Sequence, residues 1–116
     1  MKIIKKEFTI EMKFYETYAE EEKGIYYGGI VEPEIDKLVI DVIDGERYDL
    51  EKDEFIKNAK HEIHISGCKK AIRELGEYLI ALTEYETSDP SYHDHFDDIS
   101  NSHGEKKVDL TIYKPK

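Results

Sequence analysis

The segment GCKKAIRELGEYLIALTEYE, residues 67 to 86, decides the fold of this chain. Its apolar residues recur at helical spacing and form one stripe: Cys68, Ile72, Leu75, Leu79 and Leu82, joined by Ala71 and Tyr78. Ser66 stands where its side chain can cap the first turn. The pattern predicts one long amphipathic helix over 67–86 with Leu75, Leu79 and Leu82 buried.

Cys68 lies on this stripe and is the only cysteine of the chain. A thiol near a helix start, beside two lysines, has features of a reactive cysteine. Free cysteine more often behaves as a small buried hydrophobe, so we predict a buried, slowly reacting thiol. A single cysteine excludes an internal disulfide and a cysteine-rich zinc site.

Strand patterns flank the helix on both sides. In the first half, apolar residues alternate over 8–14, and IYYGGIV at 25–31 is typical of a returning strand. Gly28 and Gly29 within it indicate a bulge or a close backbone approach. Alternation resumes over 61–66, and it returns over 108–113, where Val108, Leu110 and Ile112 are expected to face inward.

The middle of the chain gives a weaker pattern. Leu38, Ile40 and Val42 alternate, and Asp44-Gly45 then predicts a tight hairpin with 46–50 as the returning arm. Residues 51–60 fit either a short helix or a polar loop.

These elements and the length of 116 residues predict a single domain over 1–116. One apolar helix stripe has to be buried against something, and the strands offer a sheet face. The expected fold class is therefore α+β: a two-layer domain with a mostly antiparallel sheet and one long helix packed on one face.

Composition restricts the functions that this chain can have. Charged residues make up 38% of it, against about a quarter in an average chain, and the net charge is −10. Such acidity disfavours binding to nucleic acid and to anionic membranes and favours a basic protein as partner. The N-terminal residues do not form a signal peptide and no apolar run could span a membrane, so a cytoplasmic protein is expected.

The acidity is most one-sided between Arg73 and Lys106. Residues 74–105 hold nine carboxylates and no Lys or Arg, whereas charges elsewhere are mixed. A block of one sign repels itself, so it often has an external counterpart. This interval favours a surface that meets a basic protein.

The same interval contains a histidine-rich stretch, DPSYHDHFDDISNSHGE at 89–105, which is predicted to be a loop over 89–103. His93, His95 and Asp97 offer nitrogen and oxygen ligands for a metal ion, and His103 could reach back to them. The spacing matches no recognised metal motif. A module that binds a metal or small ligand here stays open as an alternative, as does a structural or regulatory domain without a site.

No nucleophile elbow, phosphate loop or dinucleotide motif occurs in the sequence, so neither an enzyme nor a cofactor is predicted. The run ISGCKKAIRELGEYLIALTEYETSDPSYHDHFDDI, with its Tyr-His-x-His-Phe-Asp-Asp segment at 92–98, resembles the small bacterial immunity proteins of polymorphic toxin systems. The family is the one called immunity protein 32, and the resemblance covers 62–113. It implies a cytoplasmic protein that binds and blocks a cognate toxin without chemistry of its own.

The acidic interval and this resemblance together predict an immunity-like inhibitor that neutralises a basic toxin through an acidic surface. Carboxylates are expected to steer the partner, and aromatic side chains are expected to anchor it. The predicted partner-binding residues are Glu77, Glu84, Tyr85, Glu86, Tyr92, Asp94, Phe96, Asp97 and Asp98.

Overall fold

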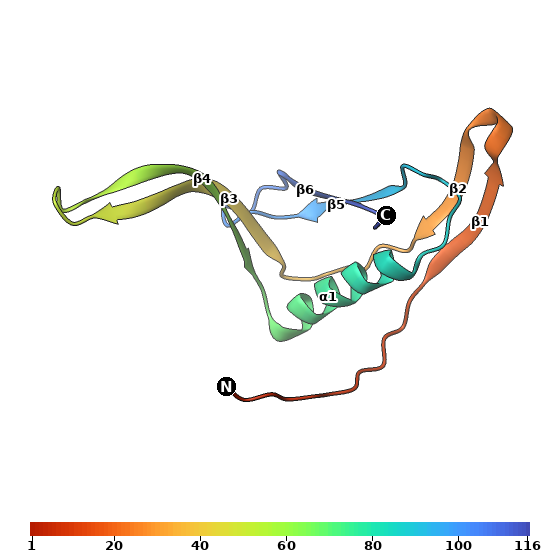
Figure 1. The fold of residues 1–116 in the computed structure, drawn as a ribbon, viewed down its shortest axis with the longest axis horizontal. Helices are drawn as coiled ribbons and strands as arrows, with labels where there is room; N and C mark the ends of the chain where they lie inside the picture. The colour runs from red at the N-terminus through yellow and green to blue at the C-terminus, as the bar shows by residue number, and fades with distance from the viewer.

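The computed structural model describes residues 1–116 and contains six strands and one α-helix (Figure 1). In chain order the elements are β1 (Phe14–Glu20), a 3-10 helix η1 (Glu21–Lys23), β2 (Ile25–Ile30), β3 (Val39–Asp49), β4 (Glu54–Ser66), α1 (Lys69–Glu84), β5 (His93–Ile99) and β6 (Val108–Tyr113). No helix is both long enough and apolar enough to cross a membrane.

The strands pair as three antiparallel hairpins, β1–β2, β3–β4 and β5–β6, and each hairpin is a two-stranded sheet of its own. The α+β class and the antiparallel pairing are confirmed, but the single continuous sheet is not formed. Only one parallel bridge, between Val39 and Ser100, joins β3 to the end of β5, where Ile40 N–H donates to Ser100 O at 3.0 Å. The hairpins diverge from there, and α1 lies below them (Figure 1).

The core forms where α1 meets the inner ends of the hairpins. The buried face of α1 carries Ala71, Leu75, Tyr78, Ala81 and Leu82, followed by Tyr85. The hairpins and the connection between β2 and β3 contribute Ile30, Leu38, Ile40, Phe96 and Ile99. Val108, Leu110 and Ile112 of β6 pack against this cluster, as their alternation predicted.

The helix is confirmed, but its predicted buried stripe is partly wrong. Leu75 and Leu82 are buried as expected, whereas Leu79 is 41% exposed and Ile72 is 44% exposed. The buried face is rotated toward Tyr78 and Tyr85, which cover more area than aliphatic side chains and keep their hydroxyls at the edge of the core.

The start of the helix also differs from the prediction. Cys68 is exposed rather than buried, and it takes the N-cap position instead of Ser66. Its Sγ accepts a hydrogen bond from Ala71 N–H at 3.4 Å, which satisfies one of the free donors in the first turn. The thiol therefore caps the N-terminus of α1, and the prediction that it is buried is wrong.

Residues 1–13 do not form the strand predicted over 8–14. This segment belongs to no strand until β1 begins at Phe14, although the Lys13 carbonyl already accepts from Val31 N–H at 3.0 Å, and it runs along the outer side of α1 (Figure 1). The side chain of Phe8 is exposed, with the Arg73 guanidinium 4.8 Å from the centre of its ring. The alternating pattern of this stretch therefore does not correspond to a paired strand.

The predicted hairpin at Asp44-Gly45 is also wrong, because β3 continues through it to Asp49. Pairing with β4 shifts register between Asp44 and Glu46, so Gly45 forms a bulge. A Cβ on Gly45 would lie 2.4 Å from Asn58 Oδ1, and this close approach explains the glycine. The chain turns instead at residues 50–53, and most of 51–60 is strand rather than helix or loop.

Gly28 and Gly29 do mark an irregular, closely approached strand. The β1–β2 register shifts between Tyr15 and Tyr18, opposite these glycines, and both glycines have positive φ (113° and 140°). A Cβ on Gly28 would stand 2.9 Å from the Tyr85 hydroxyl and 3.0 Å from Thr17 Cα. The predicted bulge and close approach are both present.

Gly28→Ala should therefore lower the free energy of unfolding by about 1–3 kcal/mol, the cost of a strained backbone position. The control is Gly76→Ala in α1, where nothing lies within 4 Å of the added Cβ. That variant should gain up to about 1 kcal/mol from helix propensity. Urea unfolding of both variants measures the difference, and a Gly28→Ala protein as stable as wild type would show that this backbone is not constrained.

Candidate protein-binding surface

The stretch predicted to be a loop over 89–103 is mostly strand, because β5 occupies His93 to Ile99. Its side chains alternate: Phe96 is buried against α1, and Asp94 accepts a hydrogen bond from the Tyr78 hydroxyl on the helix. His93 and His95 point away from the helix side, with their ring centres 4.9 Å apart. The alternation therefore divides the His/Asp segment between core and surface.

The histidines have partners other than a metal ion. The Nδ1 atom of His95 lies 3.1 Å from Asp109 Oδ2 on β6, and that of His93 lies 3.0 Å from the Ser91 carbonyl. His103 lies in another place, beside Asp41 of β3, so it does not reach back. No group of three or more His, Cys, Asp or Glu side chains is placed to hold a metal ion.

The predicted aromatic anchors lie mainly in the core. Tyr85 is 3% exposed and Phe96 is 2% exposed, so neither ring is free to contact a partner. Tyr92 is half-buried; its ring centre lies 4.8 Å from that of Tyr85, and its hydroxyl accepts from Ile30 N–H at 3.3 Å. These aromatic residues fasten β2 and β5 to the end of α1.

The predicted acidic residues lie largely at the surface. Glu84, Glu86, Asp97 and Asp98 are exposed, and Glu77 and Asp94 are half-buried. Asp98 pairs with Lys106 across the turn between β5 and β6. The remaining carboxylates have no ion-pair partner within 4.0 Å and are free to attract a cation.

Glu77 belongs to a groove between α1 and the segments on either side of the β1–β2 hairpin. The groove has a volume of about 450 Å³ and is lined on one side by Glu74 and Glu77 of the helix. On the other side stand Glu32 and Glu34, which flank Pro33 after β2, and Glu11 from the N-terminal segment. We call these five glutamates and the space between them the acidic groove; the one base in its lining is Lys13, 3.7 Å from Glu11, and Lys70 lies 3.5 Å from Glu74.

Glu32 connects the acidic groove to the carboxylates of the β5–β6 hairpin. Burial raises the pKa of Glu32 above its usual value, and the nearby charges of Asp94, Asp97 and Asp109 raise it further. Glu32 therefore links the acidic groove to the charges of these three aspartates. A cation placed there would relieve the repulsion that the raised pKa of Glu32 reports.

The raised pKa of Glu32 gives a pH-dependent prediction. The folded state favours protonated Glu32 over ionised Glu32. The stability that the protonated carboxyl contributes is therefore fully present below pH 4.5 and is lost as the pH rises through the folded-state pKa. Glu32→Gln should therefore raise the midpoint of thermal unfolding at neutral pH and leave it unchanged below pH 4.5. A control, Glu22→Gln on η1, should show no such difference; equal curves for both variants would contradict the crowding of Glu32.

The charges on α1 oppose the helix dipole. The first turn has no acidic residue and begins with Lys69 and Lys70, while the last turn has no basic residue and ends with Glu84. Charges of these signs cost roughly 0.3–1 kcal/mol each at low salt when they face the wrong end of a helix. Stability of the helix therefore does not explain the carboxylate of Glu84 at its C-terminal end.

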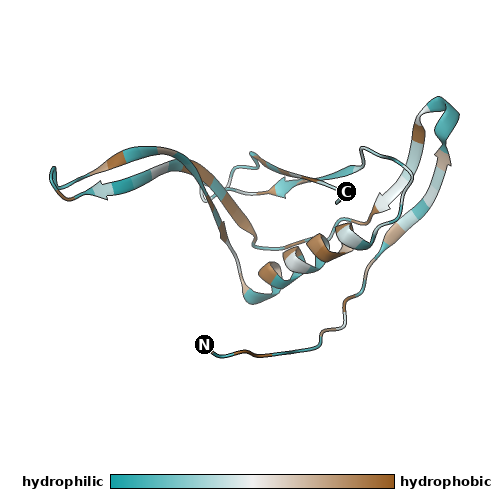
Figure 2. Ribbon diagram, in the orientation of Figure 1, coloured by the Kyte–Doolittle hydropathy of each residue, from teal (hydrophilic) through white to brown (hydrophobic).

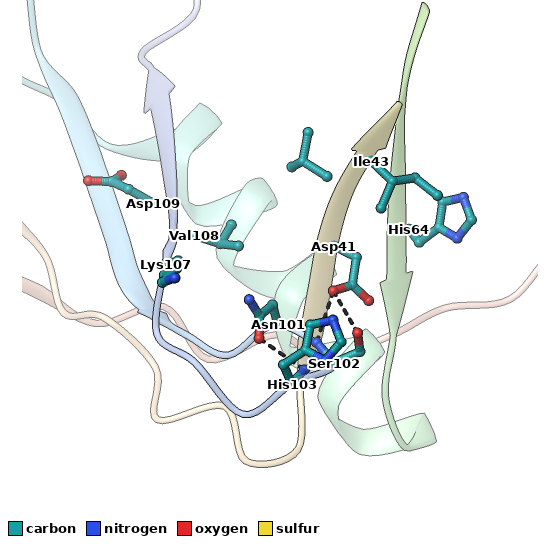
Figure 3. A pocket seen from close by; sticks show the side chains of 10 residues that line it. Asp41, Ile43, His64, Asn101, Ser102, His103, Lys107, Val108 and Asp109 are labelled. Carbon is teal, nitrogen blue, oxygen red and sulfur yellow. Dashed lines mark hydrogen bonds between the residues drawn. The ribbon is translucent and has the colours of Figure 1, made fainter. Parts of the chain in front are cut away.

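A second hollow, of about 680 Å³, opens where β3 and β6 diverge (Figure 3). Two hydrogen bonds join β3 to the 101–104 turn here: Asp41 Oδ1 accepts from Ser102 N–H at 2.9 Å and from Ser102 Oγ at 3.0 Å. These hydrogen bonds lower the pKa of Asp41. The same hydrogen bonds hold the 101–104 turn against β3.

The second half of the chain carries most of these acids, and it is this half that matches a known family. Residues 62–115 match Immunity protein 32. The match begins inside β4, contains α1 and the β5–β6 hairpin, and confirms the resemblance noted over 62–113. No curated protein and no solved structure matches the chain.

The segment that matches Immunity protein 32 contains Glu74, Glu77 and the aspartates of β5 and β6. Glu11, Glu32 and Glu34 come from the part of the chain that the family does not cover. Sequence reasoning missed these three, although the Glu-Pro-Glu run directly after β2 was a signal: a proline there fixes two carboxylates at the end of a strand.

Proposed function

We propose that this protein is a non-enzymatic immunity protein that binds a basic cognate toxin through its acidic surface and so neutralises it in the cytoplasm. The match of residues 62–115 to Immunity protein 32 carries the proposal. The family name implies a toxin as partner in general. That the toxin is basic is our inference from the charge of this chain.

Charge supports this choice of surface. In the acidic groove and at Asp94, Asp97 and Asp109, carboxylates outnumber bases: Lys13, Lys70 and His95 each pair with one of them, and Lys or Arg side chains of a toxin would meet the rest. Opposite charges increase the association rate and exclude acidic proteins as partners. A toxin that acts on a polyanion has basic residues where it meets its substrate, so covering them would block it.

The roles of the predicted contact residues are then divided. Glu77, Glu84, Glu86, Asp97 and Asp98 are proposed to face the toxin, with Glu32 and Glu34 added from the groove. Tyr85, Tyr92 and Phe96 are proposed to act through the fold, because they hold β5 against α1 and so fix the position of Asp94 and Asp97.

Co-expression in bacteria tests the proposal. Cells that express the toxin encoded beside this gene should stop growing, and the wild-type chain should restore growth. The double variant Glu77→Lys, Asp97→Lys should restore it poorly at equal protein level, whereas Glu22→Lys, on the distant η1 turn, should restore it fully. Toxicity that the wild-type chain does not relieve would refute the immunity function. Rescue by all variants would refute the proposed role of the acidic surface in binding the toxin.

A further inference from the structure

The β3–β4 hairpin extends away from the rest of the molecule as a two-stranded ribbon (Figure 1). β3 has 11 residues and β4 has 13, and no residue of β4 is buried. An isolated two-stranded hairpin is marginally stable in water and needs a third strand or a packed face. Beyond Asp41, which Ser102 contacts, no third strand of this chain pairs with the ribbon.

One face of the ribbon carries an apolar strip that continues the core outward. Register pairs Ile40 with Ile65 and Val42 with Ile63, so the four side chains share one face. Ile40 is buried in the core, whereas Val42 is 58% exposed, Ile63 is 66% exposed and Ile65 is 48% exposed. Figure 2 shows hydrophobic bands on both strands of the ribbon. We call Val42, Ile63 and Ile65 the ribbon strip.

The accessible surface area of the whole chain exceeds that of a compact monomer, which indicates that a large surface is available to a partner. Its accessible surface is 9617 Å², whereas a compact monomer of 13.6 kDa has about 6,600 Å². The radius of gyration is 18.7 Å, against about 13 Å for a compact domain of this length. The ribbon, residues 1–13 and the β1–β2 hairpin all add to this excess. It is larger than the roughly 800 Å² per partner of a standard interface.

The charges around the ribbon strip favour a second copy of this chain over a basic toxin as the partner that covers the strip. The exposed charge next to the ribbon strip is already balanced: Asp44 Oδ2 lies 3.3 Å from Lys57 Nζ, and Asp44 Oδ1 lies 3.6 Å from His61 Nδ1. The carboxylates that could attract a basic protein lie away from the strip: Glu32, Glu34 and Glu77 of the acidic groove and Asp97 of β5 have no ion-pair partner within 4.0 Å. A basic protein would be drawn there, while an apolar, locally neutral strip suits its own copy.

We propose that the ribbon strip packs against the same strip of a second copy, so that two chains form a symmetric dimer through their β3–β4 ribbons. A two-fold axis places each Ile63 against apolar side chains of the other chain and removes both strips from water. It leaves the acidic groove of each copy free. This proposal does not depend on the identity of the toxin.

Analytical ultracentrifugation of the purified chain at micromolar concentration tests the dimer. Wild type should sediment at twice its chain mass of 13.6 kDa. Ile63→Lys should sediment as a monomer, and Ile63→Thr, which keeps a β-branched residue in the strand, should weaken the dimer at least tenfold. The matched control is Tyr27→Lys, because Tyr27 is 57% exposed on the β1–β2 hairpin; it should remain dimeric.

Three outcomes would overturn the proposal: a monomeric wild type, an Ile63→Lys protein that stays dimeric, or a Tyr27→Lys protein that dissociates to the same degree. A monomeric wild type would mean that the ribbon strip does not bind a second copy and contacts the toxin or another partner instead. The second and third would place the interface away from the strip. Circular dichroism of each variant shows that loss of the dimer is not loss of the fold.

Discussion

Leu82→Ala should lower the free energy of unfolding by about 2–5 kcal/mol, the range for truncating a buried leucine. Leu82 is 1% exposed and lies on the buried face of α1, in its last turn. The core has only 11 buried hydrophobic residues, so few neighbours can shift to fill the cavity. Because small domains have about 5–15 kcal/mol of stability in total, this variant should unfold at markedly lower urea concentration.

Leu79→Ala is the matched control for Leu82→Ala. It makes the same chemical change one turn earlier in α1, at a side chain that is 41% exposed. Its cost should be less than half that of Leu82→Ala, because the removed methyl groups were already partly in water. Equal losses, or a greater loss at Leu79, would mean that the helix buries the stripe predicted from sequence and not the rotated face described above.

The second large effect concerns the rate of binding to the toxin. The double variant Glu77→Lys, Asp97→Lys should associate at least about tenfold more slowly at low salt, since it weakens the field that we propose attracts a basic toxin. The loss should shrink as salt screens charges within about 10 Å. Stopped-flow fluorescence at several ionic strengths measures the rate.

The control for charge alone is a pair of reversals at η1, Glu21→Lys and Glu22→Lys, which change the net charge by the same amount far from the groove. Their effect on the association rate should be small. A rate that depends only on net charge, equal in both double variants, would show that the groove has no special role in steering.

Local patterns predicted the elements that a short segment can define by itself. The helix, β2 and β6 each have a complete apolar period within 6 to 16 residues, and all three are present. The face of α1 was harder to predict, because hydropathy favours Leu79 and Ile72 over Tyr78 and Tyr85. Tertiary contacts reversed that order: the two tyrosine rings meet Phe96, Phe14 and Tyr92.

The ribbon could not be predicted from its strongest local signal. Asp44-Gly45 has the composition of a tight turn, but the opposing strand approaches Gly45 so closely that only a glycine fits a bulge there. The true turn is made at Asp49, whose Oδ1 accepts from Glu51 N–H at 3.0 Å. Which of two possible turns forms depends on the pairing of residues far apart.

The residues of the candidate surface come from both halves of the chain. The acidic interval at 74–105 is a linear feature, and the structure leaves several of its carboxylates exposed. Glu32 and Glu34 join the same field from a distant part of the chain, and only the fold brings them to Glu77. The aromatic anchors illustrate the opposite error, because Tyr85 and Phe96 are adjacent to acids in sequence but belong to the core.

The most direct measurement of the central claim is a titration of the purified toxin with the purified chain, in which toxin activity and complex formation are followed together. A binding inhibitor should abolish activity at one chain per toxin, and the complex should appear in step with the loss. Failure to form a complex would contradict the account, and so would protection by far less than one chain per toxin, because only a catalyst can neutralise many toxin molecules in turn.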